Sequence, residues 1–346
     1  MRIFFVVPFA GVGGGETQTR ILAEGMLARG VEVAFIFRGG SPYGEGLADW
    51  SKSRGVYVGG PYEDSKEFRR QCIAWAGSWS PDWILTHDCE RELSALQACY
   101  KIPTLWQQHT VFPARVDQAS RVKATKIVCV SRANRRVLVE KYPFLSPRTV
   151  AIPNGVPLTF GFGVESRREE WGIASEGPVA AWVGRFDEAK GTDLVAKAMR
   201  DCGVVGIIGG RGDGMRYTQR VLRIQSKPER IRYFTEGVDS AEVFASCDFA
   251  VLPTRAEGGV FYSCMEAMVM GKPVITTRVA DLPEVFKDGR DLLFCDYNAE
   301  SVKQAMLRAV ELGEVGRRRM GLAARRKIYE HYNEDAMVEK YLEVMS

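Results

Sequence analysis

The stretch that decides the fold is IFFVVPFAGVGGGETQTRILAEGM, residues 3–26. Its first five residues are aliphatic or aromatic, which predicts a buried β-strand over residues 3–7. Residues 17–29 carry apolar side chains at helical spacing, and Gly30 stands where a glycine commonly ends a helix. A strand that passes through the glycine turn of residues 13–15 into a helix is typical of α/β proteins with parallel sheets.

The glycine turn could also bind an anion. Glycines allow a ligand to approach the backbone, and the amides of the following helix would point at it. The dinucleotide-binding pattern G-x-G-x-x-G fails, because its last glycine, counted from Gly11, falls on Glu16. The chain has no G-K-[ST] triplet, which excludes a P-loop kinase or ATPase. Turn geometry alone would explain the glycines equally well.

Outside this stretch, short apolar runs alternate with amphipathic segments, as expected of parallel sheets covered by helices. The first six predicted strands span residues 3–7, 31–37, 83–87, 104–108, 126–130 and 149–153. A polar, glycine-rich stretch, 154–170, separates them from six more at 179–184, 204–209, 231–235, 249–253, 273–277 and 291–295. We therefore predict two Rossmann-like, doubly wound parallel-sheet domains that face each other across a cleft.

Length and composition agree with a two-domain enzyme. The 346 residues exceed the usual size of a single core, and 46% hydrophobic with 26% charged residues is ordinary for a soluble protein. The net charge is only +4, with lysines and arginines spread along the chain, so no nucleic-acid partner is expected.

The eight cysteines are scattered, and none has the C-x-x-C spacing of a redox or zinc site. Reduced thiols and the lack of an apolar run near the ~20 residues of a membrane span predict a cytoplasmic protein. One basic stretch with an apolar end leaves weak peripheral contact with the inner membrane face open, although a solvated helix face explains it more simply. It comprises Arg132, Arg135, Arg136, Lys141, Phe144 and Leu145.

The second half of the chain opens with two cations near the end of a strand. In VGRFDEAKG, residues 183–191, Arg185 ends the predicted strand and Lys190 lies in the loop after it. Two cations in this position suit a diphosphate. As isolated residues, they would more often be a solvated pair.

Two glutamates occur in LPTRAEGGVFYSCMEAMVMGKPVITT, residues 252–277. Glu257 lies in a glycine loop after a strand, and Glu266 lies in the helix that follows. A carboxylate can accept two hydroxyls of a ribose, and a helix start offers amides to sugar and phosphate oxygens. For a lone glutamate, an exposed helix position is the simpler interpretation.

A histidine completes the set of candidates. In WQQHT, residues 106–110, His109 stands at the carboxyl end of a first-half strand. A single histidine at such a place is more often a structural hydrogen-bonding group than a catalyst.

Taken together and in this order, the segments resemble glycosyltransferase family 4, the retaining enzymes of GT-B architecture, over nearly the whole chain. The segments that carry the resemblance are GGGE (13–16), WQQHT (106–110), VSRANRRVL (130–138), IPNGV (152–156), VGRFDEAKG (183–191), IGGRGDG (208–214), AEGGVFYSCMEAMVMGKPVI (256–275) and DGRDLL (288–293).

The resemblance implies an acceptor-side domain over residues 1–155, joined by a C-terminal helix over 326–346, and a nucleotide-sugar donor domain over 156–325. Arg185 and Lys190 would neutralise the diphosphate leaving group. Glu266 would hold the ribose.

It also implies which groups meet the sugar and the acceptor. Glu257 would hold the transferred sugar, and Glu16 and His109 would lie on the acceptor side, with His109 beside the reacting carbon. His109, Glu257, Arg185 and Lys190 would form the catalytic set. The remaining donor-binding positions would be the backbone at Gly14, Gly15, Gly258, Gly259, Val260 and Phe261.

The chain departs from the family pattern at the two glutamates. The family usually separates them by seven residues, whereas eight intervene between Glu257 and Glu266. Two alignments are therefore open, one of which puts Gly258 where the first glutamate belongs. Pro157 also follows IPNGV where an aspartate is common.

The resemblance implies a retaining transfer of a hexose-type sugar from a nucleoside-diphosphate sugar, most commonly a UDP-sugar, to an acceptor hydroxyl. The chain has no paired-aspartate metal motif, so we expect no metal and no other cofactor, with Arg185 and Lys190 in place of the cation. The alternatives are a nucleotide-sugar epimerase, which shares the architecture, and a catalytically silent sugar-nucleotide-binding subunit.

Overall fold

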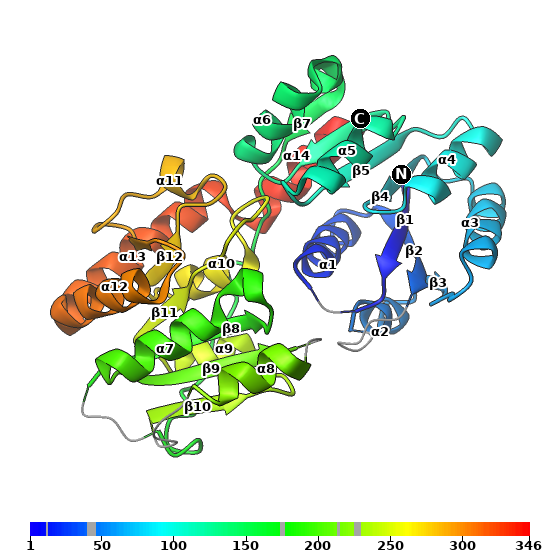
Figure 1. Ribbon diagram of the computed structural model, residues 1–346. Coiled ribbons are helices and arrows are strands. Elements are labelled where there is room, and N and C mark those ends of the chain that lie inside the picture. Colours follow the sequence, from blue (N-terminus) through cyan, green and yellow to red (C-terminus); the bar gives the residue numbers. More distant parts are fainter. Residues whose placement is uncertain (12, 40–45, 174–176, 213–214, 225–229) are drawn as a thin grey trace. The chain divides into compact units, whose positions relative to one another are not determined.

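The computed structural model describes residues 1–11, 13–39, 46–173, 177–212, 215–224 and 230–346. The last two residues of the IGGRGDG motif therefore lie outside the described residues. The chain forms two compact units (Figure 1): unit 1 comprises Met1–Gly155 with Glu334–Ser346, and unit 2 comprises Val156–Asn333.

Unit 1 is built on a seven-stranded parallel sheet in the order β3-β2-β1-β4-β5-β6-β7. Its strands are β1 (Arg2–Phe9), β2 (Glu32–Gly39), β3 (Tyr57–Gly59), β4 (Trp83–Thr86), β5 (Thr104–Gln108), β6 (Lys126–Cys129) and β7 (Thr149–Ala151). Its helices are α1 (Gly14–Leu27), α2 (Gly46–Ser53), α3 (Ser65–Trp79), α4 (Glu90–Cys99), α5 (Pro113–Arg121), α6 (Arg132–Lys141), the 3₁₀ helix η1 (Pro143–Arg148) and α14 (Glu334–Met345).

Unit 2 has a six-stranded parallel sheet in the order β10-β9-β8-β11-β12-β13. Its strands are β8 (Val179–Arg185), β9 (Val205–Arg211), β10 (Ile231–Phe234), β11 (Phe249–Leu252), β12 (Val274–Thr277) and β13 (Leu293–Cys295). Its helices are the 3₁₀ helix η2 (Glu188–Lys190), α7 (Thr192–Cys202), α8 (Met215–Leu222), α9 (Ser240–Ala245), α10 (Tyr262–Val269), α11 (Leu282–Val285), α12 (Ala299–Glu311) and α13 (Gly313–His331).

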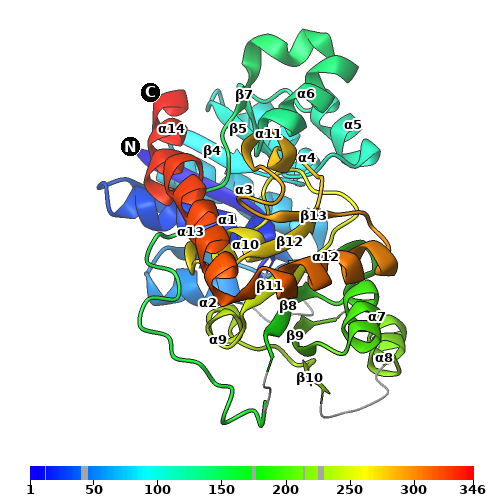
Figure 2. The ribbon, with the colours of Figure 1, turned by 90° about the vertical axis from the view of Figure 1, so that its left-hand side faces the viewer.

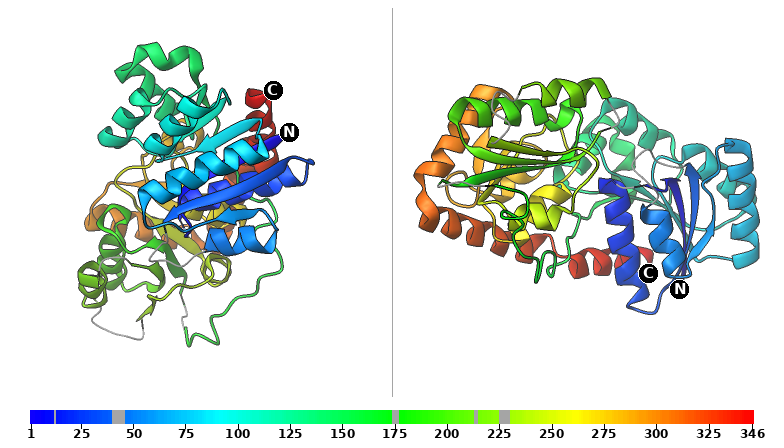
Figure 3. Two further views of the ribbon diagram at one scale, coloured as in Figure 1. Left: turned by 90° about the vertical axis from the view of Figure 1, so that its right-hand side faces the viewer. Right: turned by 90° about the horizontal axis from the view of Figure 1, so that it is seen from below.

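Both sheets are doubly wound, with helices on both faces (Figure 3). This explains why the strands are visible in the sequence as uninterrupted apolar runs: a parallel strand covered on both faces is buried along its whole length. In β1, every residue from Ile3 to Pro8 is buried. The predicted architecture of two Rossmann-like sheets is confirmed.

All twelve predicted strands are present, with ends that differ by one or two residues. The strand that sequence reasoning missed is β3, which has three residues and lies at the edge of its sheet. Its apolar run, Val56 to Val58, has only three residues, fewer than the four to eight that identify a strand in a sequence.

The C-terminal segment divides between the units differently from the prediction that residues 326–346 all return to the first domain. Residues 326–333 stay in unit 2, where Ile328 is fully buried and the ring of Tyr332 stacks on Phe286 at 6.2 Å. Only α14 belongs to unit 1, where it packs beside α1 (Figure 2) and buries Met337 and Tyr341. Within α13 the buried side chains are Met320, Ala324 and Ile328, which pack in unit 2, and the chain enters unit 1 only with α14.

In the structure, the basic stretch with an apolar end is less exposed than the sequence suggests. Leu145 is completely buried, so only Phe144, at 64% exposure, remains of the apolar end. Arg135 donates to the carbonyl of Thr149 at 2.9 Å and to Oγ of Ser146 at 3.3 Å, which makes it a structural residue. Over the described residues, no helix is both long and apolar enough to cross a bilayer.

All eight cysteines have free thiols. Burial raises the pKa of Cys89, Cys129 and Cys295 to about 12, which keeps these thiols protonated and unreactive.

Candidate functional site

Each sheet has a point at which its strand order reverses, and ligands of doubly wound sheets bind beyond the strand ends at that point. In unit 1 the reversal falls between β1 and β4, and in unit 2 it falls between β8 and β11. The predicted site residues follow these strands or their direct neighbours.

The loop after β8 in unit 2 places both predicted cations. Arg185 is the last residue of β8, and its Nε donates to Oδ2 of Asp187 at 2.8 Å. The other oxygen of Asp187 accepts from the backbone amide of Lys190 at 3.1 Å and so caps η2. The indole of Trp182 donates to the carbonyl of Lys190 at 3.2 Å. The backbone of Lys190 is therefore held on two sides, and sequence reasoning missed that Asp187 pairs with the neighbouring arginine.

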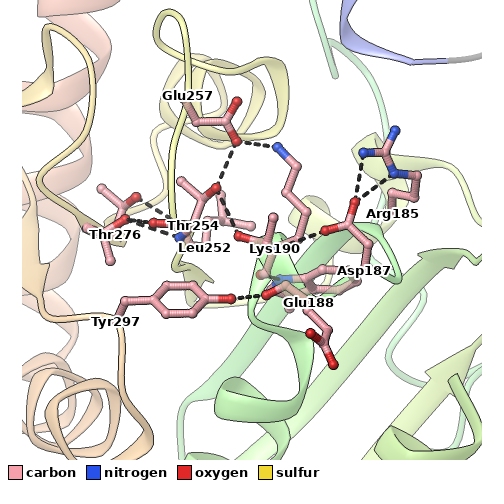
Figure 4. A network of polar contacts seen from close by, with 12 residues as sticks. Arg185, Asp187, Glu188, Lys190, Leu252, Thr254, Glu257, Thr276 and Tyr297 are labelled. Carbon is pink, nitrogen blue, oxygen red and sulfur yellow. Dashed lines mark hydrogen bonds and ion pairs between the residues drawn. The ribbon is translucent and has the colours of Figure 1, made fainter. Parts of the chain in front are cut away.

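The loop after β11 brings a carboxylate to this lysine (Figure 4). Nζ of Lys190 forms an ion pair with Oε1 of Glu257, and Oγ1 of Thr254 donates to the same oxygen at 2.9 Å. Thr254 is itself fixed to β12, because its amide donates to Oγ1 of Thr277 at 3.1 Å and its carbonyl accepts from that hydroxyl at 2.6 Å. The ammonium also lies 5.3 Å from the ring centre of Phe261, within cation–π range.

This geometry bears on the two alignments that the spacing left open. The side chain that meets Lys190 belongs to Glu257, whereas Gly258 has no side chain to offer and is buried with Gly259 in the loop. Phe261 forms the N-terminal boundary of α10, and Glu266 lies within that helix in a partly exposed position. The carboxylate beside Lys190 in this structure is therefore that of Glu257.

In unit 1 the glycine turn meets a histidine that sequence reasoning did not select. Gly14 and Gly15 begin α1, with Glu16 in its first turn, and a Cβ at Gly15 would lie 3.5 Å from Nε2 of His87. His87 directly follows β4, and its ring lies 4.8 Å from that of His109, which directly follows β5. The structure therefore brings the glycine turn and His109 together through His87.

Both imidazoles are neutral at pH 7. Burial lowers the pKa of His87 to about 4, and burial together with the neighbouring His87 lowers the pKa of His109 to about 3. Nε2 of His109 is shielded from solvent and has no hydrogen-bond partner within the described part of the chain. Neutral imidazoles can exchange hydrogen bonds with a hydroxyl group, which suits an uncharged sugar or alcohol better than an anion.

The residue after His87 has an unusual backbone conformation. Asp88 has a φ of +55°, a conformation that non-glycine residues adopt rarely and that is enriched at functional sites. Its carboxylate pairs with Arg115 of α5 at 3.0 Å. This ion pair lies beside His87, and Arg38 adds a further positive charge near that histidine.

A buried network of hydrogen bonds lies next to the end of β5. Nε2 of Gln107 lies 3.0 Å from both Oε1 of Gln18 and Oη of Tyr341, and Nε2 of Gln18 lies 3.2 Å from the same Oη. The three side chains, from β5, α1 and α14, are at most 1% exposed. The network joins the C-terminal helix to α1, which begins at the glycine turn, and to β5, which directly precedes His109.

Sequence reasoning missed His87 and this network. The available signal was that two of the three histidines of the chain end neighbouring apolar runs, at positions 87 and 109. No group of three or more His, Cys, Asp and Glu side chains in the described ranges is arranged as a metal ion would need.

Comparison with known families covers both units. A sequence model described as "Glycosyltransferase Family 4" matches residues 12–160, and one described as "Glycosyl transferases group 1" matches residues 177–311. The chain belongs to glycosyltransferase family 4. The predicted family is therefore confirmed, and both groups of site residues fall within the matched segments.

Two curated relatives of this family 4 chain match it over segments of different length. A glycogen synthase of Thermus thermophilus is 33% identical over 165 residues, which are 45% of this chain and 37% of the relative. An α-maltose-1-phosphate synthase of Mycolicibacterium smegmatis is 24% identical over 286 residues, which are 71% of this chain and 73% of the relative. The chain thus spans little more than a third of the length of the glycogen synthases that it matches.

Solved structures share the fold over the full chain. Anabaena HepE in complex with UDP-glucose has a TM-score of 0.86 at 15% identity, with 100% of this chain and 99% of that chain covered. A glycosyltransferase of Rickettsia africae has a TM-score of 0.79 at 18% identity, with 99% and 97% covered. At these identities the likeness establishes the GT-B fold and nothing finer.

Proposed function

We propose that this chain is a metal-independent, retaining glycosyltransferase that moves a hexose-type sugar from a UDP-sugar to an acceptor hydroxyl. The observation that carries the proposal is the cluster of Arg185, Lys190 and Glu257 at the point where the strand order of unit 2 reverses. It combines cations for a diphosphate with a carboxylate for sugar hydroxyls. The structures of Anabaena HepE with UDP and with UDP-glucose support the choice of donor class.

In this proposal unit 2 holds the donor and unit 1 holds the acceptor. Lys190 and Arg185 bind the diphosphate, and Glu266 binds the ribose hydroxyls. Glu257 and the backbone from Gly259 to Phe261 bind the transferred sugar. The glycine turn of α1 and the neutral imidazoles of His87 and His109 bind an uncharged, hydroxyl-bearing acceptor.

The proposed reaction needs no side-chain nucleophile. The acceptor oxygen attacks the anomeric carbon from the face that the diphosphate leaves, so the new bond forms on the side of the broken one and the configuration is retained. A diphosphate oxygen takes the acceptor proton. The negative charge that grows on the leaving group is stabilised by Lys190 and Arg185 in place of a divalent cation.

Two measurements test the proposal. A thermal-shift panel of UDP, GDP, ADP and their glucose conjugates should identify the donor, because a bound ligand raises the melting temperature by mass action. Turnover with that donor should then persist in excess EDTA, and NMR of the product should show the anomeric configuration of the donor. Activity that returns only with magnesium or manganese, or an inverted product, would contradict the mechanism.

A further inference from the structure

The ion pair between Lys190 and Glu257 is held from both sides. The side chain of Asp187 and the indole of Trp182 fix the backbone of Lys190 by hydrogen bonds. The hydroxyl of Thr254 fixes the carboxylate of Glu257 (Figure 4). The side chains are 27% and 16% exposed, so the pair is partly withdrawn from solvent. Interactions between charges in such a position are screened less than those on the open surface.

The proposed function assigns the same lysine, Lys190, to the diphosphate of the donor. A diphosphate that binds Lys190 must share the ammonium with Glu257 and accept a like charge beside it. An ammonium has three donors and can serve both anions, but the repulsion between carboxylate and phosphate weakens the complex.

The sugar changes this balance. Both contacts of Glu257 use the oxygen Oε1, and a carboxylate has about four acceptor sites, so it can still accept bonds from hydroxyls. When a sugar nucleotide is bound, hydroxyl groups that donate to Glu257 offset the repulsion. After transfer, the free nucleoside diphosphate has no such donors, and the carboxylate is left against the phosphates.

We infer that Glu257 acts as an internal competitor of the leaving group: it pairs with Lys190, lowers the affinity for the free nucleoside diphosphate and so promotes product release. This inference rests on the proposed function and adds to it a role in product release for a residue otherwise assigned only to the sugar. It makes Glu257 the residue that sets the difference in affinity between a sugar nucleotide and its nucleoside diphosphate.

The test is Glu257→Gln, measured by isothermal titration calorimetry with the nucleoside diphosphate that stabilises the protein most among UDP, GDP and ADP. The variant should bind this nucleotide about tenfold more tightly than the wild-type protein, which corresponds to ~1.4 kcal/mol. Its affinity for the glucose conjugate should rise less or fall. Product inhibition in the transfer assay should strengthen in parallel.

Two further variants complete the design. Glu300→Gln removes the carboxylate of an exposed ion pair with Lys303, at 2.8 Å in α12, and should leave nucleotide affinity unchanged. Lys190→Met should bind the nucleotide more weakly than the wild-type protein. Circular dichroism and the melting temperature of each variant establish that it is folded.

The outcomes separate the inference from the proposed function. If the wild-type protein binds the nucleotide and Lys190→Met binds it less, but Glu257→Gln binds it equally or more weakly, the inference is wrong and the proposed function stands. If the wild-type protein binds none of the three nucleotides, the proposed function itself fails. A folded Glu257→Gln variant with tighter nucleotide binding and stronger product inhibition supports the inference.

Discussion

Replacing Lys190 by methionine removes the ammonium that is proposed to meet the diphosphate and keeps the length of the side chain. At about 4 Å and an effective dielectric constant of about 20, one such charge pair is worth roughly 4 kcal/mol. Because the lysine side chain is 27% exposed, water screens part of this energy, and we expect a loss of about 2 to 4 kcal/mol. Charge on the leaving group grows in the transition state, so the loss should fall mainly on kcat.

The expected result is a fall in kcat of between about 30-fold and 1,000-fold at saturating donor. The affinity for the donor should change less. Initial rates over a range of donor concentrations, together with calorimetry of donor binding, measure the two effects separately. Lys197→Met is the matched control, because Lys197 is 41% exposed and its ammonium pairs with Asp193 at 3.0 Å within α7 of the same unit. A kcat within threefold of the wild-type value, with only KM raised, would refute the assignment of Lys190 to the leaving group.

Three further predictions concern the donor, the folded state and the membrane. Glu266→Ala should weaken donor binding by roughly ten- to a hundredfold, since hydrogen bonds to a charged group are worth on the order of 1.5–3 kcal/mol. Unchanged affinity for both nucleotide and sugar nucleotide would show that Glu266 does not belong to the site. The pKa of His87 is lowered to about 4 in the folded protein, whereas an unfolded histidine has a pKa of about 6.5. Between these values the unfolded chain binds more protons than the folded protein. The free energy of unfolding should therefore fall as the pH decreases from 7 to 5, by about 2 kcal/mol from this residue. Urea unfolding should show a smaller pH dependence in His87→Gln, and an unchanged slope would contradict the neutral, buried state. The basic face of α6 should remain solvated, so the protein should not co-sediment with anionic vesicles; pelleting that is lost in Arg136→Glu would show a membrane contact instead.

The sequence by itself determined the fold class and the order of the elements. A parallel strand covered on both faces must be apolar throughout, and this local requirement makes β1 and the strand candidates of both halves visible as runs. The same holds for the glycine turn after β1, because the turn and the helix start impose their residue types within a few positions. Arg185, Lys190 and Glu257 could be selected from the sequence because the order of the motifs around them resembles glycosyltransferase family 4; as isolated residues, the two cations would have been interpreted as a solvated pair.

Only the tertiary structure decided which of these groups touch. Nothing in the spacing of the two glutamates shows that Glu257 contacts Lys190, because that lysine lies on a different loop, 67 residues away in the chain. The same is true of His87, which becomes a site residue because the strand order places β4 between β1 and β5. The point at which α13 gives way to α14 was likewise set by burial of Ile328 and Tyr332 in unit 2. Local sequence encodes periodicity and turns, whereas contacts between loops depend on strand order and on the competition among side chains for the same buried surface.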